Sequence, residues 1–284
     1  MMVPSLIRVS MVIGYSIANI RIKLLNLDMV SLHVFQLFLI VMALVAIIVF
    51  ISLFFVDAGY GKFYQPKWGP SIGNRLGWVL MEAPVFVAML LLWWFSDRKA
   101  DPVRLIFLLL FELHYFHRSF IFPLQIRGRS RMPLSIILMG VLFNTLNAMM
   151  QGGWIYYLSP VERYPVSWLT SLPFILGTVF FFTGMAVNIH SDSIIRNLRK
   201  PGDTAHYLPK GGMFRYVTSA NYFGEFVEWV GFAILTWSWS GAVFALWTFA
   251  NLAPRASRIY DMYAREFPDE LDTDKTKRMI PFIF

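Results

Sequence analysis

Charged and polar side chains stand inside stretches of this sequence that are otherwise apolar and long enough to cross a bilayer. They are four glutamates, one histidine, one arginine and one asparagine: Glu82, Glu112, Glu225, Glu228, His117, Arg118 and Asn188. An ionisable group at membrane depth is costly unless it faces a partner or a cavity, so such residues mark functional sites by default. We therefore expect a polar ligand or a reacting group inside a bundle of helices.

Three segments also carry polar groups at helical spacing. The sets are Asn188, Asp192 and Arg199 (four and seven residues apart), Asn221 and Glu225 (four apart), and Arg255 and Tyr263 (eight apart). Each set lies on one face of a helix. Guanidinium groups bind phosphates in a bidentate manner, while amides and carboxylates bind hydroxyls and carboxamides. The pattern predicts a nucleotide with several phosphates, two riboses and an amide-bearing ring, or else only solvated helix ends.

The chain has no GxGxxG or Walker sequence. A nucleotide site would therefore be neither of the Rossmann type nor of the P-loop type.

A second constellation pairs a carboxylic acid with a tyrosine. Glu82 lies about 10 Å along a helix from the cytoplasmic end of its apolar segment, and Tyr115 stands in the string HYFHR at 114–118. A buried acid kept neutral and a tyrosine can both donate hydrogen bonds to a carbonyl oxygen that gains negative charge. The pair indicates oxyanion stabilisation; the alternative is a structural ion pair between Glu82 and Arg118.

The composition predicts an integral membrane protein, because 57% of the residues are hydrophobic and only 15% are charged. Crossing about 30 Å of hydrocarbon takes about 20 apolar residues. Seven segments approach or exceed that length: 34–56, 76–95, 103–122, 134–158, 168–190, 218–237 and 239–252. We expect an all-α protein with seven transmembrane helices, of which the last is short.

Basic residues predict the orientation, since Lys and Arg gather on the cytoplasmic side of a membrane. Alternate loops and the C-terminal tail hold most of them: Lys62, Lys67, Arg75, Arg127, Arg129, Arg131, Arg196, Arg199, Lys200, Lys210, Arg215, Arg255, Arg258, Arg265, Lys275, Lys277 and Arg278. The remaining loops hold Arg98, Lys99, Arg104 and Arg163. This distribution predicts a cytoplasmic C-terminus and an N-terminus on the other side.

The N-terminal residues 1–33 do not fit this orientation, because Arg8, Arg21 and Lys23 would lie on the wrong side. We interpret 1–33 as an interfacial amphipathic segment, with a weak eighth span as the alternative. Residues 34–284 then form a single domain.

The composition argues against several kinds of functional site. The chain has no cysteine, which excludes disulfides, thiolate ligands and a cysteine nucleophile. His114, His117 and His190 lack matching carboxylate spacing, so we expect helix packing and no metal site. The net charge of +8 arises in the predicted cytoplasmic loops and indicates an anionic lipid or ligand rather than nucleic acid.

Several strings occur in an order that closely resembles the steroid 5α-reductases, or 3-oxo-5α-steroid 4-dehydrogenases. They are HYFHR at 114–118, NIHSD at 188–192, LRKPG at 198–202, NYFGE at 221–225, Glu228-Trp229 and IPFIF at 280–284. The resemblance runs from about residue 60 to the last residue. It implies a seven-span helical enzyme that uses NADPH to reduce the Δ4 double bond of a 3-oxo steroid.

The resemblance also implies roles for individual residues. Glu82 and Tyr115 would hydrogen-bond the 3-keto oxygen while hydride passes from the nicotinamide to C5. The implied cofactor contacts are Asn188, Asp192, Arg199, Asn221, Glu225, Arg255 and Tyr263, with Arg127 and Arg129 on the phosphate side, and the implied lining of the steroid cavity is Trp78, Phe143 and Leu252.

Four positions depart from the family's animal members. Met81 replaces a Gln beside the catalytic Glu, Met139 replaces an Arg, and His206-Tyr207 replaces a Tyr-Arg pair in the phosphate-facing loop. Because two guanidinium groups are lost, the preference for NADPH over NADH stays open. We hypothesise that His206 supplies part of the missing phosphate contact.

The physiological substrate is also open. The compact chain without cysteine indicates a protein of a bacterial inner membrane. The resemblance implies a steroid or a sterol-like lipid as the substrate, and we expect a monomer. Proteins of similar architecture reduce enoyl thioesters or polyprenols. A sterol- or lipid-binding transporter without chemistry is the alternative outside enzymology, but transporters often contain inverted repeats, and none is visible here.

Overall fold

The computed structural model describes residues 31–56, 59, 64–127, 130–198 and 205–284. Most of the predicted interfacial segment, together with Arg129 and Arg199, lies outside these residues. The chain divides into two compact units, Met1–Val41 and Met42–Phe284. The candidate site belongs entirely to the second unit.

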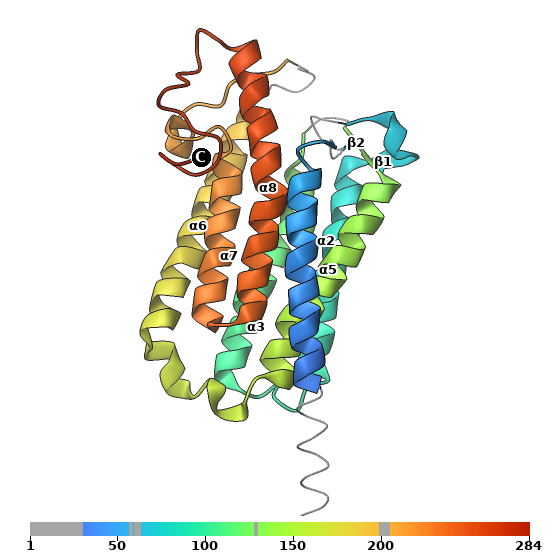
Figure 1. Cartoon of the computed structure of the whole chain (residues 1–284), viewed down its shortest axis with the longest axis vertical. Helices are drawn as coiled ribbons and strands as arrows, with labels where there is room; N and C mark the ends of the chain where they lie inside the picture. The colour runs from blue at the N-terminus through green and yellow to red at the C-terminus, as the bar shows by residue number, and fades with distance from the viewer. Residues whose placement is uncertain (1–30, 57–58, 60–63, 128–129, 199–204) are drawn as a thin grey trace, which may run out of the picture. The chain divides into compact units, whose positions relative to one another are not determined.

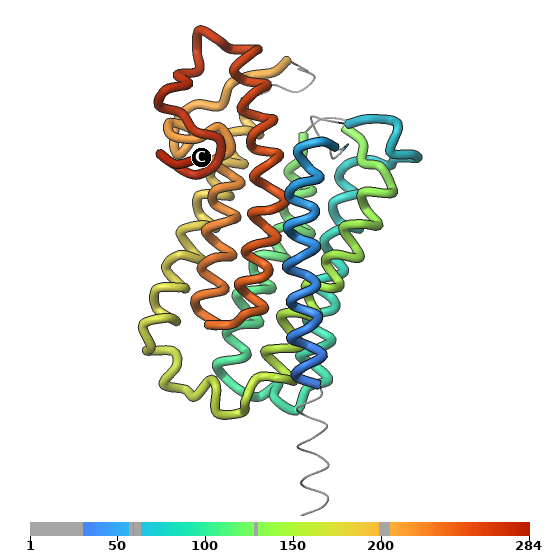
Figure 2. Tube along the Cα trace, in the orientation of Figure 1, coloured from blue at the N-terminus to red at the C-terminus, as the bar shows by residue number. Residues whose placement is uncertain are grey.

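The second unit is built mainly from helices, all of them long except the four-residue α4 (Figure 1). They are α2 (Asn74–Trp94), α3 (Pro102–Phe116), α4 (Phe122–Gln125), α5 (Leu134–Gly152), α6 (Leu172–Asn197), α7 (Ala220–Thr236) and α8 (Trp239–Glu266). A π-helical turn, His117–Ile121, joins α3 to α4, and another, Gly153–Leu158, extends α5. α2 packs on α5, while α7 lies between α6 and α8 (Figure 2).

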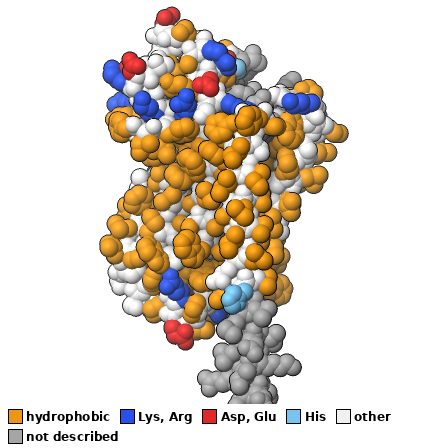
Figure 3. Space-filling model, in the orientation of Figure 1, with side chains coloured by type: hydrophobic (Ala, Val, Ile, Leu, Met, Phe, Trp, Pro, Cys, Tyr) orange, Lys and Arg blue, Asp and Glu red, His pale blue; other side chains and the backbone are white. Residues whose placement is uncertain are grey.

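Five helices of the described residues are long and apolar enough to cross a membrane: Ser31–Ser52, Asn74–Trp94, Pro102–Gln125, Leu134–Leu158 and Leu172–Asn197. The prediction of a helical membrane protein is thereby confirmed. Large apolar side chains on the outer faces of these helices, such as Leu138, Leu142 and Val179, are exposed. Figure 3 shows hydrophobic side chains over the middle of the helices and basic side chains gathered beyond them. Lipid is the solvent that such a surface requires.

Two helix ends differ from the predicted segments. α6 continues past residue 190 to Asn197, as the shared face of Asn188 and Asp192 requires. α8 runs to Glu266, whereas the predicted apolar segment stops at 252. Charged residues end the apolar run there, but they do not end a helix, and Pro254 is accommodated within it.

The backbones of α6 and α7 touch. A Cβ placed on Gly184 would lie 2.2 Å from the backbone nitrogen of Glu228, and one on Gly224 would lie 2.4 Å from that of Asn188. Gly177 and Gly231 repeat this contact seven residues away, with Cβ positions 2.3 Å and 2.4 Å from backbone nitrogens of the facing helix. Small residues permit such close approach of helices in membranes. We call these four glycines the glycine seam.

A short ribbon of β1 (Ser71–Gly73) and β2 (Arg131–Pro133) pairs antiparallel, with Ile72 opposite Met132. This ribbon differs from the expectation of an all-α chain. β1 leads directly into α2 and β2 directly into α5. The ribbon therefore holds the first turns of these two helices side by side, so that their polar residues meet further along.

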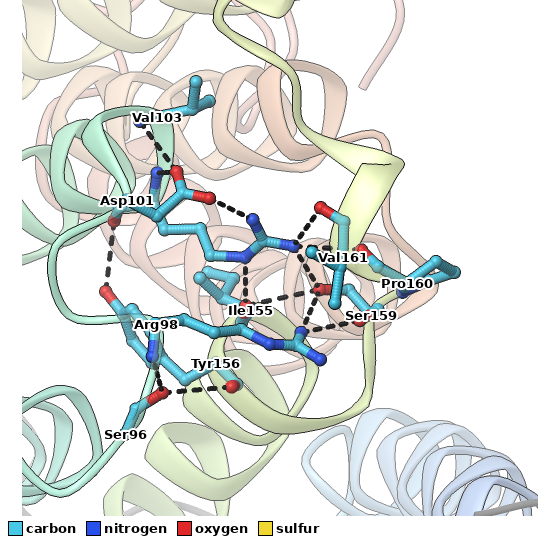
Figure 4. A network of polar contacts seen from close by, with 10 residues as sticks. Ser96, Arg98, Asp101, Val103, Ile155, Tyr156, Ser159, Pro160 and Val161 are labelled. Carbon is cyan, nitrogen blue, oxygen red and sulfur yellow. Dashed lines mark hydrogen bonds and ion pairs between the residues drawn. The ribbon is translucent and has the colours of Figure 1, made fainter.

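Two of the arginines on the sparsely charged side serve a structural purpose (Figure 4). Arg104 is 1% exposed, pairs with Asp101, and donates to the carbonyl oxygens of Ile155 (2.9 Å) and Pro160 (3.0 Å). Arg98 donates to the carbonyl oxygen of Ser159 at 2.6 Å. The last carbonyls of a helix have no partner within it. These guanidinium groups thus close the end of the π-helical extension of α5.

Candidate active site

Glu82 lies on α2 and faces α5. Asn144 of α5 donates from Nδ2 to the carbonyl oxygen of Met81 (2.8 Å) and to Glu82 Oε2 (3.2 Å). The Met81 side chain packs with Ile136 and Ile137. The Met81 side chain cannot donate a hydrogen bond. A donor from another helix, Asn144, bonds directly to the Glu82 carboxyl group.

Tyr115 lies on α3 and faces the same side of α5. Its side chain is 2% exposed, and its Oη accepts a hydrogen bond of 2.9 Å from Asn147 Nδ2. The ring packs against Phe111 and Trp229, with centroids 4.7 Å and 5.6 Å away. Glu82 and Tyr115 thus bond to two amides of α5 that are three residues apart, Asn144 and Asn147, so the two groups expected to hold a carbonyl oxygen belong to one cluster.

Arg118 lies in the π-helical turn that follows α3. Its guanidinium approaches Asp192 Oδ2 (3.6 Å) and Glu225 Oε2 (3.4 Å), and it stacks on the rings of Trp78 (4.7 Å) and Phe122 (4.6 Å). Its charge also acts on Glu82. Such turns insert an extra residue into a helix and often occur at functional sites. Arg118 joins residues from α2, α6 and α7.

The predicted polar faces of α6 and α7 meet directly. Asn188 Nδ2 donates to the carbonyl oxygen of Asn221 (2.9 Å), and Asn221 Nδ2 donates to Asp192 Oδ1 (3.0 Å). Asn188 and Asp192 are both buried. Four of the predicted cofactor residues, Asn188, Asp192, Asn221 and Glu225, are thus linked to one another through hydrogen bonds or through Arg118.

A second ionisable pair lies one turn from Glu225. His114 Nδ1 is 2.9 Å from Glu228 Oε1, and the His114 ring contacts Tyr115 (5.0 Å) and Trp229 (4.5 Å). Both side chains are buried. His114 therefore does more than fill space between helices: it provides the hydrogen-bond partner of a buried carboxyl group.

The other predicted cofactor residues occupy the end of the unit that carries most of the basic side chains. Arg127 donates to the carbonyl oxygen of Arg196 at 3.3 Å, and Arg255 donates to the Tyr222 hydroxyl at 2.8 Å. Tyr263 is buried and packs against Phe267.

His206 lies in the segment between α6 and α7. Its Nδ1 is 2.9 Å from Glu266 Oε2, at the last residue of α8. A phosphate group that bound His206 would have to compete with this carboxylate.

The three residues predicted to line an apolar cavity have different surroundings. Trp78 stacks on Arg118. Phe143 contacts Phe244 and Trp247, with centroids 6.1 Å and 4.7 Å away. Leu252 is buried in a cluster that also contains Met279 of the C-terminal segment. Among these three residues, only Trp78 has a described contact with Arg118.

Sequence reasoning missed Asn144, Asn147 and Gln151. All three are buried on one face of α5, three and four residues apart, inside a segment that was interpreted only as apolar. Their helical spacing is the same signal that identified the polar faces of α6 and α7, and it could have identified this face as well.

Comparison with known proteins finds one matching family and several relatives. A family described as 3-oxo-5-alpha-steroid 4-dehydrogenase matches residues 130–284, which include α5 to α8. Steroid 5-alpha-reductase DET2 of Gossypium hirsutum is 36% identical over 251 residues, which cover 87% of this chain and 96% of that protein. Human 3-oxo-5-alpha-steroid 4-dehydrogenase 1 is 41% identical over 229 residues, which cover 79% and 86%.

The similarity extends to a second mammalian form. The 3-oxo-5-alpha-steroid 4-dehydrogenase 2 of Sus scrofa is 38% identical over 238 residues, which cover 82% of this chain and 91% of that protein. These relatives come from a plant and from mammals. Because the identity extends over most of each protein, the chain belongs to the 3-oxo-5-alpha-steroid 4-dehydrogenase family.

Proposed function

We propose that this protein reduces the Δ4 double bond of 3-oxo steroids to the 5α-dihydro product, with NADPH as the reductant. The observation that carries the proposal is the buried cluster in which Glu82 and Tyr115 stand beside the polar faces of α6 and α7, in a chain of this family. An acid and a phenol form one half of the cluster. Groups suited to a nicotinamide dinucleotide form the other.

The residues around Arg118 fit such a cofactor. Asp192 Oδ2 and Glu225 Oε2 are buried and have no hydrogen-bond partner within the described part of the chain, although both face the Arg118 charge. Ribose hydroxyls and a carboxamide could donate to these oxygens. Arg127, Arg129, Arg199 and Arg255 would hold the phosphates, with His206 as a further contact, while Asn188, Asn221 and Tyr263 would bind the remainder.

The reaction places negative charge on the 3-keto oxygen. Glu82 and Tyr115 donate hydrogen bonds to that oxygen, which polarises the enone and makes C5 electrophilic. When bound, the dihydronicotinamide supplies a hydride to C5. The two donors stabilise the resulting enolate until C4 is protonated. Trp78, Phe143 and Leu252 would hold the apolar steroid rings.

The proposed placement uses seven spans. The membrane would be crossed by the five apolar helices given above, by α7 and by the first half of α8. The C-terminus would lie in the cytoplasm and the N-terminus outside. Residues 34–284 would form the reductase domain and 1–33 an interfacial segment. We place the protein, as a monomer, in a bacterial inner membrane.

The test is turnover by the detergent-purified protein. NADPH oxidation should depend on progesterone or testosterone, and chromatography should identify a 5α- rather than a 5β-dihydro product. Glu82→Gln and Tyr115→Phe should retain NADPH binding and lose at least about tenfold in kcat, because the first replaces the acidic O–H by a weaker N–H donor and the second removes the phenol donor to the developing oxyanion. Normal turnover by both variants would refute the mechanism, and NADPH binding without steroid turnover would redirect the search to enoyl or polyprenyl substrates.

A further inference from the structure

A chain of buried amides runs from α8 to Tyr115. Gln151 Nε2 lies 3.0 Å from the carbonyl oxygen of Ser240 and 3.3 Å from Asn147 Oδ1, and Asn147 Nδ2 lies 2.9 Å from Tyr115 Oη. Asn147 and Gln151 are completely buried. The chain therefore connects a backbone group of α8 to the phenol of α3 through two side chains of α5.

The backbone carbonyl determines the direction of every hydrogen bond in this chain. A carbonyl oxygen can only accept, so Gln151 must turn its NH₂ group toward Ser240. The same NH₂ group donates its second proton to Asn147, so that Asn147 must present its oxygen to Gln151. Its NH₂ group then faces Tyr115. Asn147 can donate to the phenol oxygen but cannot accept the phenol proton.

This direction matters for the chemistry at Tyr115. A phenol whose oxygen already accepts a hydrogen bond keeps its own proton for another acceptor, and a donor behind the oxygen strengthens the bond that the phenol donates in front. If Asn147 were reversed, the phenol proton would point to Asn147 Oδ1 and away from a substrate.

Asn144 repeats the arrangement at the other catalytic candidate. Its NH₂ group is directed by the Met81 carbonyl oxygen, which can only accept, and it also donates to Glu82 Oε2. One helix thus supplies a fixed donor to both groups that are expected to bind the carbonyl oxygen.

We propose that Asn147 is a positioning residue for the reduction, and that it directs the Tyr115 proton to the 3-keto oxygen. This inference rests on the proposed function, in which Tyr115 donates to that oxygen. The residue acts through Tyr115 and does not itself touch the steroid.

The experiment is a double-mutant cycle with Tyr115→Phe. Asn147→Leu has a similar size but cannot donate, so we expect it to lower kcat about tenfold, as expected for the loss of one well-placed hydrogen bond. KM and the Kd for NADPH should stay within about twofold, since steroid and cofactor contacts are intact. In the Tyr115→Phe background, the same substitution should lower kcat no further, because the oxygen on which Asn147 acts is gone.

Two further variants keep the test interpretable. Asn147→Asp retains an acceptor for Gln151 but presents an acceptor to the phenol, so it should lower kcat at least as much as Asn147→Leu. Thr145→Val is the control, because Thr145 lies on the exposed side of α5 and its hydroxyl bonds only to the Val141 carbonyl oxygen in the described contacts. It should have wild-type kinetics.

The outcomes separate this proposal from the proposed function. An equal loss of kcat from Asn147→Leu with and without the Tyr115 hydroxyl, or no loss at all, would refute the positioning role while leaving the catalytic role of Tyr115 intact. Normal turnover by Tyr115→Phe alone would refute both.

Discussion

At the scale of single residues, Arg118 has the most demanding surroundings in the candidate site. One guanidinium contacts two aromatic rings, Trp78 and Phe122, which pack edge to face on each other, and it faces two carboxyl groups from different helices. Arginine suits this position better than lysine, because its planar group stacks on rings and forks toward two acceptors. The residue therefore connects Trp78, which is proposed to contact the substrate, with Asp192 and Glu225, which are proposed to contact the cofactor.

Removing this charge should affect both stability and cofactor binding. We expect Arg118→Gln to lower the free energy of unfolding by about 3–5 kcal/mol, because Asp192 and Glu225 would remain buried without their cation. Thermal unfolding in detergent and NADPH titration measure the two effects. Arg118→Lys keeps the charge but not the stacking, so its loss of stability should be smaller; an equal loss in both variants would contradict an electrostatic role.

The pairing of His206 with Glu266 leads to a second prediction at this scale. If His206 contacts a cofactor phosphate, His206→Ala should weaken NADPH binding by up to about tenfold, since an exposed charge contributes about 1 kcal/mol or less. Titration of the detergent-purified protein and of the variant with NADPH measures the difference.

The control for this prediction lies in the same segment. Lys210 forms a similar exposed pair with Glu270, 2.7 Å apart, but is not expected to contact the cofactor, so Lys210→Ala should leave the affinity for NADPH unchanged. An affinity for NADPH that does not change in His206→Ala would refute the phosphate contact.

Single residues also show what the sequence could and could not predict. The polar faces of α6 and α7 were predictable, because residues four apart share a face of any helix. Their mutual contact was not, since hydrogen bonds such as Asn221 to Asp192 depend on how two helices pack. Asn144 and Asn147 were overlooked because isolated amides hardly change the hydropathy of an apolar segment.

At the scale of helices, the glycine seam places Asn188 opposite Gly224 and Glu228 opposite Gly184. Any side chain at these positions would push the two backbones apart, and with them the hydrogen bonds that connect α6 to α7. The close approach of α6 and α7 at the seam is therefore required for the hydrogen bonds among Asn188, Asp192 and Asn221, which are proposed to bind the cofactor.

We expect Gly184→Ala and Gly224→Ala each to destabilise the protein by about 1–3 kcal/mol through overpacking and to weaken NADPH binding as well. Thermal unfolding and cofactor titration would measure both. Gly73→Ala is the matched control, because a Cβ there meets nothing within 4 Å. A free energy of unfolding equal to that of the wild type in both seam variants would contradict the claim that α6 and α7 must approach closely.

Helix boundaries show where hydropathy is informative and where it is not. Apolar composition located five membrane-spanning helices well. It underestimated α8, because the helix continues through charged residues, and it could not indicate the β1–β2 ribbon, whose three-residue strands are held by pairing with each other. The π-helical turn at Arg118 likewise has no simple sequence pattern.

At the scale of the whole molecule, the distribution of basic residues predicts which ends of the helices face the cytoplasm. The structure adds a reason for two apparent exceptions, since Arg98 and Arg104 are engaged by carbonyl groups and do not act as free surface charges.

The absence of cysteine from the sequence makes the orientation directly measurable. Asp274→Cys and Glu162→Cys each introduce one thiol at an exposed position on opposite sides of the predicted membrane. In sealed vesicles of known sidedness, a membrane-impermeant maleimide should label the first only from the cytoplasmic side and the second only from the other side. Labelling of both from one side would refute an odd number of spans between them.

The glycine seam also bears on how this protein can evolve. Where two helices meet through side chains, a change on one can be compensated by a change on the other, and the interface drifts over time. At the glycine seam, each glycine contacts backbone atoms of the facing helix. A larger residue there cannot be compensated by a smaller side chain on the other helix. We therefore expect substitutions to be tolerated at lipid-facing side chains and not at the seam. Such substitutions can suit a different membrane without changing the polar residues between α6 and α7.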